Sequence, residues 1–126
     1  FGIVQEARSK SSSAPVAVKS ISKGQKANFE RGIQKIKQEI VALEKLDHPN
    51  IVRLVEVFED RKAVFLVMEL CTGRSLLDLL EESRTLSEPL AAVLMQQVFA
   101  AVRYMHGRGG VCHRDLKPEN LLFQSA

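Results

Sequence analysis

The 126 residues are 45% apolar and 26% charged, and 18 Lys and Arg against 15 Asp and Glu give a formal net charge of +3. This composition indicates one globular domain, and so small and scattered a positive charge argues against nucleic acid or a membrane surface as partner. No apolar run is long enough to cross a bilayer, and we expect no signal peptide. Cys71 and Cys112 fit no metal or redox spacing, so we expect reduced, buried thiols in a cytoplasmic protein.

The first third of the chain predicts two strands followed by a helix. The strands are residues 1–7 and Val16–Ile21, joined by the serine-rich link Arg8–Pro15. Asn28 is the expected N-cap of the helix, and Gly32 inside it costs roughly 1 kcal/mol relative to Ala. The apolar residues of the helix recur at spacings of three and four, which places them on one face: Phe29, Ile33, Ile36, Ile40, Leu43 and Leu46.

The rest of the chain predicts a hairpin and two helices. Ile51–Phe58 and Val64–Met68 have the pattern of strands, and the charged residues between them indicate a turn. A short helix is expected over Ser75–Glu82, and Ser87 is the N-cap of a longer one with a proline near its start. The longer helix is apolar nearly all round, and a helix of that kind is normally buried on several sides. Only 21 residues follow Met105, so we expect its packing partners to be missing from this sequence.

His113–Asn120 reads H-R-D-L-K-P-E-N, which resembles the catalytic loop of eukaryotic serine/threonine protein kinases. The resemblance implies that Asp115 orients an acceptor hydroxyl and takes its proton. It also implies that Lys117 offsets the charge of the transferred phosphate and that Asn120, five residues after Asp115, binds a metal ion. Pro118 restricts the backbone between them.

The kinase resemblance extends upstream to a lysine and a glutamate. Val16–Lys19 matches the V-A-x-K strand pattern, with Ala17 at the nucleotide and Lys19 at its phosphates. Glu39 is the implied partner of Lys19, and it flanks the apolar stripe, so we expect its carboxylate to be partly withdrawn from water. Taken singly, Lys19 could equally be a surface strand lysine, and Glu39 a helix-surface glutamate beside neighbouring lysines.

Two further stretches resemble kinase nucleotide-binding segments. Met68, Glu69 and Cys71 match the hinge, where the Glu69 carbonyl and the Cys71 amide would bond the adenine edge. Core packing alone would also account for Met68. Gly2 and Val4 resemble the end of the glycine-rich loop, where glycine lets the backbone approach phosphate oxygens.

Within the kinases the chain looks nearest to the calcium-dependent and calmodulin-dependent group. The resemblance implies ATP and Mg²⁺ as cofactors, a protein substrate, and regulation of the calcium/calmodulin type through regions outside these residues. It also implies that Arg114 pairs with a phosphorylated activation loop. Relatives have Gly-Gly-Glu where this chain has Gly73-Arg74-Ser75, which puts a preference for basic substrates in doubt, although Glu119 remains as an acidic contact for a substrate arginine.

We therefore expect an α+β, protein-kinase-like fold. Residues 1–69 would form the small lobe, an antiparallel sheet plus one helix, and residues 70–126 the hinge and the start of the large lobe through the catalytic loop. The D-F-G metal-binding segment would lie beyond Ala126. Two alternatives remain: a non-catalytic pseudokinase or scaffold that binds nucleotide, and a small-molecule phosphotransferase sharing the fold.

Overall fold

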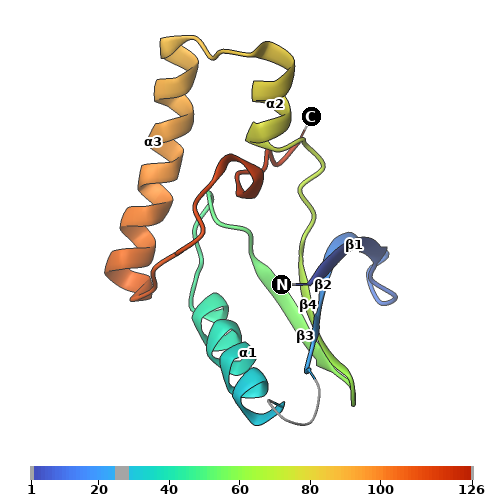
Figure 1. Ribbon diagram of the computed structural model, residues 1–126. Coiled ribbons are helices and arrows are strands. Elements are labelled where there is room, and N and C mark those ends of the chain that lie inside the picture. Colours follow the sequence, from blue (N-terminus) through green and yellow to red (C-terminus); the bar gives the residue numbers. More distant parts are fainter. Residues whose placement is uncertain (1, 25–28, 126) are drawn as a thin grey trace. The chain divides into compact units, whose positions relative to one another are not determined.

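The computed structural model describes residues 2–24 and 29–125, and the chain divides into two compact units (Figure 1). The first unit comprises Phe1–Asp47 and Val52–Leu70, and the second comprises His48–Ile51 and Cys71–Ala126. The short segment His48–Ile51 therefore belongs with residues that follow it by more than twenty positions. No described helix is long and apolar enough to span a membrane.

The first unit is built on a four-stranded antiparallel sheet with the strand order β1-β2-β4-β3. Its strands are β1 (Ile3–Arg8), β2 (Pro15–Ser22), β3 (Leu54–Glu59) and β4 (Ala63–Glu69). All four strands overlap their predicted ranges, although β3 begins at Leu54 and not at Ile51, and the predicted β3–β4 hairpin is present. The two central strands, β2 and β4, carry the buried residues of the sheet, which are Val16, Ile21, Val64, Leu66 and Val67.

Helix α1 (Phe29–Glu44) packs its apolar stripe against this sheet. Ile36 forms one buried cluster with Ile21, Val64 and Leu66, of which Leu66 is only 1% exposed. Ile40 and Leu43 of the stripe, together with Leu54 and Val57 of β3, pack around that cluster. Burial of a side chain of this size contributes about 1.5 to 3 kcal/mol, so the stripe is what holds α1 on the sheet. The expected N-cap, Asn28, lies outside the described residues.

The second unit contains α2 (Leu76–Ser83) and α3 (Glu88–Tyr104). Ser75 caps α2 in a reciprocal capping box, because its hydroxyl accepts from the Asp78 N–H while the Asp78 carboxylate accepts from the Ser75 N–H. Ser87 caps α3, as the sequence predicts. After α3 the chain makes a wide π-type turn over Met105–Gly109 and then enters the loop that carries H-R-D-L-K-P-E-N.

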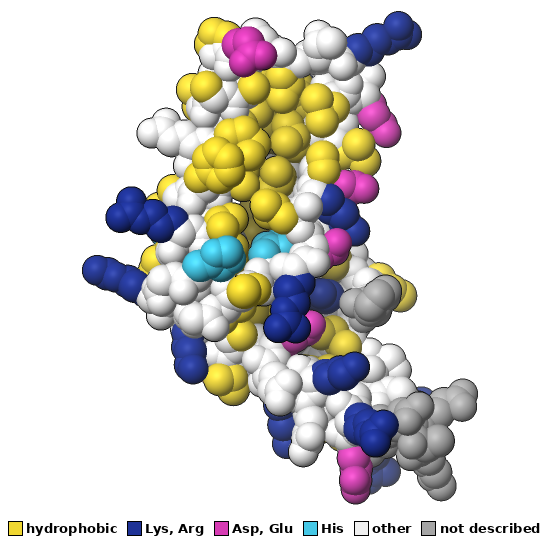
Figure 2. All heavy atoms as spheres, turned by 60° about the vertical axis from the view of Figure 1, so that its left-hand side comes forward, with side chains coloured by type: hydrophobic (Ala, Val, Ile, Leu, Met, Phe, Trp, Pro, Cys, Tyr) yellow, Lys and Arg dark blue, Asp and Glu magenta, His cyan; other side chains and the backbone are white. Residues whose placement is uncertain are grey.

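Most of the apolar surface of α3 is exposed in the described chain, as expected from the missing packing partners. Only Ala101 of this helix is buried, whereas Phe99 is 64% and Val93 is 54% exposed. Figure 2 shows apolar side chains gathered over a broad area of one face. The described residues simply do not include enough packing partners to cover every side of so apolar a helix.

Candidate active site

The catalytic-loop residues form a compact polar group around Asp115. The Lys117 Nζ lies 3.2 Å from Asp115 Oδ2, and Asn120 Nδ2 donates to the same carboxylate oxygen at 3.0 Å and to the Asp115 carbonyl at 2.8 Å. A 3₁₀ turn over Pro118–Asn120 produces this arrangement, because it folds Asn120 back so that its N–H donates to the Lys117 carbonyl at 2.9 Å. The structure thus brings together all three residues that the sequence predicts for the catalytic loop.

The environment of Asp115 favours its ionised form. The Lys117 ammonium lowers the pKa of the Asp115 carboxyl, and the hydrogen bond from Asn120 lowers it further, with the nearby His113 contributing in the same direction. The Asp115 side chain is 65% exposed, so a molecule from solution can reach it. A carboxylate that is ionised, positioned and accessible can accept a hydrogen bond from a hydroxyl group.

Two features define the conformation of the loop at Arg114. Arg114 has φ +64°, in the left-handed region that costs a residue with a side chain about 1 to 3 kcal/mol. The Asp115 N–H donates to His113 Nδ1 at 3.2 Å, which closes the turn around Arg114. Local strain at a position next to Asp115 is consistent with a backbone selected for the position of that carboxylate.

Four of the residues predicted to bind nucleotide, which are Val4, Ala17, Lys19 and Met68, lie on one face of the sheet. In the strand register, Lys19 is directly opposite Val4 on one side and Leu66 on the other, and Ala17 is opposite Met68. Directly opposed residues of antiparallel strands point to the same face, and so do residues two apart in a strand. Since Leu66 belongs to the core shared with α1, Lys19 is on the face that α1 covers.

The structure does not bring Lys19 and Glu39 into contact. Lys19 is half-buried, but Glu39 is exposed, so the expected withdrawal of its carboxylate from water is wrong. Among the described residues no ion pair joins the two side chains. A carboxylate at the margin of an apolar stripe keeps its hydration when it can reach solvent, because desolvation without a paired cation is costly. The functional pairing of Lys19 with Glu39 stays a prediction.

The remaining nucleotide-binding candidates have clear local environments. An added Cβ on Gly2 would lie 2.5 Å from the Ser20 carbonyl oxygen, so this position requires glycine for its approach to β2. Glu69 is held to the start of β3, where its N–H donates to the Arg53 carbonyl and its carboxylate accepts from the Arg53 N–H, both at 3.0 Å. Cys71 is half-buried and Cys112 is exposed, so the expectation that both are buried is wrong.

Sequence reasoning missed a strand-like pairing that ties the catalytic loop to the start of α2. Gly73 donates its N–H to the Phe123 carbonyl at 3.1 Å, and Phe123 donates back to the Arg74 carbonyl at 3.0 Å. An added Cβ on Gly73 would lie 2.6 Å from the same Phe123 oxygen, so glycine is required here too. The only sequence signal was the glycine itself. Ser75, at the position of the relatives' glutamate, uses its hydroxyl in the α2 cap.

Comparison with known proteins identifies the family. The model of the protein kinase domain matches residues 1–126. This chain belongs to the protein kinase domain family. The family and the α+β fold class predicted from the sequence are therefore confirmed.

The similar proteins include calcium-regulated kinases. The chain is 41% identical over 123 residues to calcium-dependent protein kinase 3 of Plasmodium yoelii yoelii, a match that covers 98% of this chain and 22% of that protein. It is 47% identical over 110 residues to calcium/calmodulin-dependent protein kinase type 1 of Macrobrachium nipponense, covering 87% of this chain and 31% of that protein. The crystal structure of Rad53 1-466 in complex with AMP-PNP matches with a TM-score of 0.83 and 34% identity over 95% of this chain and 30% of that one. The chain thus spans between about a fifth and a third of the length of these relatives.

Proposed function

We propose that the whole protein transfers the γ-phosphoryl group of ATP to serine or threonine hydroxyls of protein substrates. The observation that carries this proposal is the group formed by Asp115, Lys117 and Asn120, in which both partners lie within 3.2 Å of one exposed carboxylate. Membership of the kinase family, the names of the kinase relatives and the AMP-PNP complex of the similar structure support it.

The catalytic loop supplies the groups that act on the acceptor. Asp115, ionised because its pKa is lowered, accepts the hydrogen bond of the substrate hydroxyl, orients the oxygen toward the phosphorus and takes the proton. The Lys117 ammonium, 3.2 Å from the Asp115 carboxylate, places positive charge beside the site where phosphate charge accumulates.

The first unit supplies the groups that bind ATP. Val4, Ala17 and Met68 provide apolar and small side chains on the Lys19 face of the sheet, and Lys19 provides the cation for the phosphates. The backbone groups we assign to the adenine edge are the Glu69 carbonyl and the N–H of Cys71, the residue at which the second unit resumes. We assign Gly2 to the phosphate-binding loop.

Asn120 fits the role of a magnesium ligand. Its amide nitrogen is engaged by Asp115, and its oxygen makes no hydrogen bond within residues 2–24 and 29–125, so the oxygen is available to a metal. Magnesium prefers oxygen ligands in octahedral geometry and neutralises phosphate charge. The described residues contain no cluster of three His, Cys, Asp or Glu side chains that could hold a metal ion, so Asn120 would act together with phosphate oxygens and further ligands.

We also propose a cytoplasmic protein regulated through calcium or calmodulin. The names of the calcium-dependent relatives support this regulation. The free thiol of Cys112, which is exposed, is compatible with a reducing compartment. Glu119 is an exposed carboxylate in the catalytic loop and is our candidate for contacting a basic substrate residue.

The test is phosphoryl transfer by the purified whole protein. The protein is incubated with magnesium, γ-labelled ATP and a mixed protein substrate, and the labelled amino acids are identified after hydrolysis. We expect phosphoserine and phosphothreonine. Nucleotide binding without transfer would favour the pseudokinase alternative, and label on small metabolites alone would favour the small-molecule phosphotransferase.

A further inference from the structure

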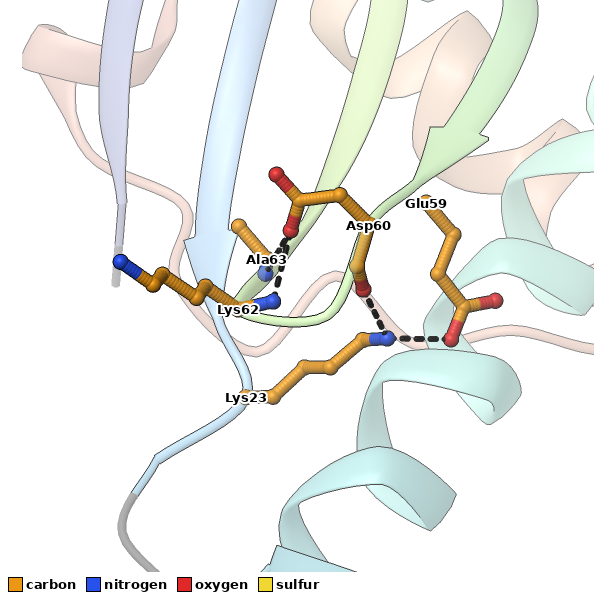
Figure 3. A network of polar contacts seen from close by, with 5 residues as sticks. All are labelled: Lys23, Glu59, Asp60, Lys62 and Ala63. Atoms are coloured by element: carbon orange, nitrogen blue, oxygen red, sulfur yellow. Dashed lines mark hydrogen bonds and ion pairs between the residues drawn. The ribbon is translucent and has the colours of Figure 1, made fainter.

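Lys23 is the only charged residue that is buried in the part of the chain the structure describes, with 6% of its surface exposed. Its ammonium donates to Glu59 Oε1 and to the main-chain carbonyl of Asp60, both at 2.5 Å (Figure 3). Its own N–H donates to the Lys62 carbonyl at 2.9 Å. Because a buried ammonium is tolerated only when it is paired, these contacts fix the end of β2 to the turn between β3 and β4.

The turn that receives Lys23 is organised by its own hydrogen bonds. Asp60 Oδ1 accepts from the N–H groups of Lys62 and Ala63, both at 2.7 Å, and the Asp60 N–H donates to the Ala63 carbonyl at 3.0 Å (Figure 3). These backbone donors also lower the pKa of the Asp60 carboxyl. The turn therefore does not depend on Lys23 for its conformation, and it gives Lys23 a fixed point of attachment.

The backbone of Lys23 meets helix α1 at Gly32. An added Cβ on Gly32 would lie 3.3 Å from the Lys23 carbonyl oxygen, which is tighter than nine in ten of the contacts that Cβ atoms make in proteins. This approach explains why a glycine stands inside α1 in spite of its poor helix propensity. Lys23 thus joins three elements: the end of β2, the β3–β4 turn and the first half of α1.

This junction sets the position of α1 along β2. Ile21 lies two residues before Lys23, and Ile36 lies four residues after Gly32. Because Ile21 and Ile36 share the buried cluster, the helix runs back along the strand. The distances agree, since two strand residues span about 6.6 Å and four helix residues about 6 Å. Counted from Lys23, Lys19 lies about 13 Å back along β2. Counted from Gly32, Glu39 lies about 10.5 Å along α1 in the same direction.

Glu39 also lies on the side of the helix that this alignment requires. It is seven residues from Gly32, nearly two full turns, so both residues lie on the same side of α1. Lys19 and Ile21 are two residues apart in β2, so their side chains point to the same face of the strand, which is the face that α1 covers. The register fixed at Lys23 and Gly32 therefore brings Glu39 to the level of Lys19.

We propose that Lys23 is a positioning residue: it holds α1 in the register on β2 that sets Glu39 level with Lys19 along the strand, from where the two side chains can pair. The proposal deepens the phosphoryl-transfer function proposed above and rests on it. It assigns no contact with nucleotide or substrate to Lys23. It differs from a purely stabilising role of the ion pair with Glu59, which would strengthen the fold without a specific link to Glu39.

The experiment is a double-mutant cycle in the whole protein. Lys23→Met removes the charge but keeps an apolar stem of similar length, and Glu39→Gln removes the charge of the proposed dependent residue. Lys62→Met is the matched control, because Lys62 is exposed and takes part in the same network only through its main chain. For each variant, kcat and KM for ATP, the melting temperature and the hydrogen exchange of residues 29–44 are measured.

We expect Lys23→Met to lower kcat/KM at least about 5-fold in the wild-type background and less than about 2-fold in the Glu39→Gln background, because coupled residues are not additive. Exchange in α1 should rise in Lys23→Met and stay unchanged in Lys62→Met. Gly32→Ala should lower kcat/KM, because an added Cβ would crowd the Lys23 carbonyl oxygen and displace it from α1.

Equal losses from Lys23→Met in both backgrounds would overturn the proposal and leave Lys23 as a stabilising residue. If the wild-type protein transferred no phosphate, the proposed function would fail by itself, and the hydrogen exchange of α1 would still test whether Lys23 holds the helix. Unchanged exchange in Lys23→Met would refute it.

Discussion

Replacing Asp115 with Asn isolates the chemical role of this carboxylate from its structural role. The substitution is isosteric and keeps an oxygen that can accept from the Asn120 amide, which now lies 3.0 Å from Oδ2. The side chain is 65% exposed, so the melting temperature should hardly change. Turnover, however, should fall about 10²- to 10⁴-fold, the usual contribution of a positioned general base.

Asp78→Asn is the matched control for this variant. Asp78 is likewise an exposed aspartate whose pKa is lowered by hydrogen bonds, in its case from Ser75. Asp78 completes the capping box of α2 with its charged carboxylate and takes no part in the site, so its replacement should lower the melting temperature and leave turnover unchanged. The two aspartates should thus give opposite patterns of stability and activity.

The assay combines steady-state phosphoryl transfer by the whole protein, nucleotide affinity by calorimetry and thermal unfolding. Asp115→Asn should bind ATP with nearly wild-type affinity while losing turnover. Retention of more than about a tenth of the wild-type turnover, with unchanged stability, would refute the assignment of Asp115 as the group that handles the acceptor proton.

Three other outcomes are expected. Lys19→Met and Glu39→Gln should be strongly non-additive in kcat/KM for ATP, because either change already breaks the pair; additive losses would make Glu39 an ordinary surface residue. Lys117→Met should raise the pKa of Asp115, since it removes the cation and hydrogen bond that favour the carboxylate, and the Asp115 carboxyl resonance should then titrate at higher pH. The 126-residue chain expressed by itself should transfer no phosphate and should self-associate in sedimentation experiments because α3 exposes large apolar side chains; a monodisperse, active monomer would contradict this.

The strands, helices and catalytic loop could be predicted because their signals are local. The stripe of α1 repeats every three or four residues, and Asp115, Lys117 and Asn120 lie within six consecutive positions. Their contacts follow from one short turn once Pro118 fixes the backbone. Tertiary packing is not needed to bring these three side chains together, so the residue pattern alone identified the group.

The features that sequence reasoning missed or misjudged depend on residues far apart in the chain. Lys23 and Glu59 are 36 positions apart, and nothing in either segment indicates that a lysine there is buried. The pairing of Gly73 with Phe123 joins segments fifty positions apart in the same way. The exposure of Glu39 is also a tertiary property, since helical periodicity places it at the margin of the stripe but does not say what covers that margin.

These differences predict that the proposed acceptor side, which is the Asp115 group, and the proposed phosphate side, which is Lys19 with Glu39, respond differently to mutation. The acceptor side is held within one loop, so distant substitutions should leave the Asp115 group intact unless they reach the Gly73–Phe123 pairing. The phosphate side depends on the placement of a whole helix on a sheet, which is set by Lys23 and Gly32 at one end and needed by Glu39 at the other. A shift of one residue in that register moves Glu39 by about 1.5 Å along the helix axis and turns it by about 100°, enough to take its carboxylate away from Lys19. Changes far from any substrate, at the β3–β4 turn or at Gly32, should therefore alter use of ATP before they alter the handling of the acceptor hydroxyl.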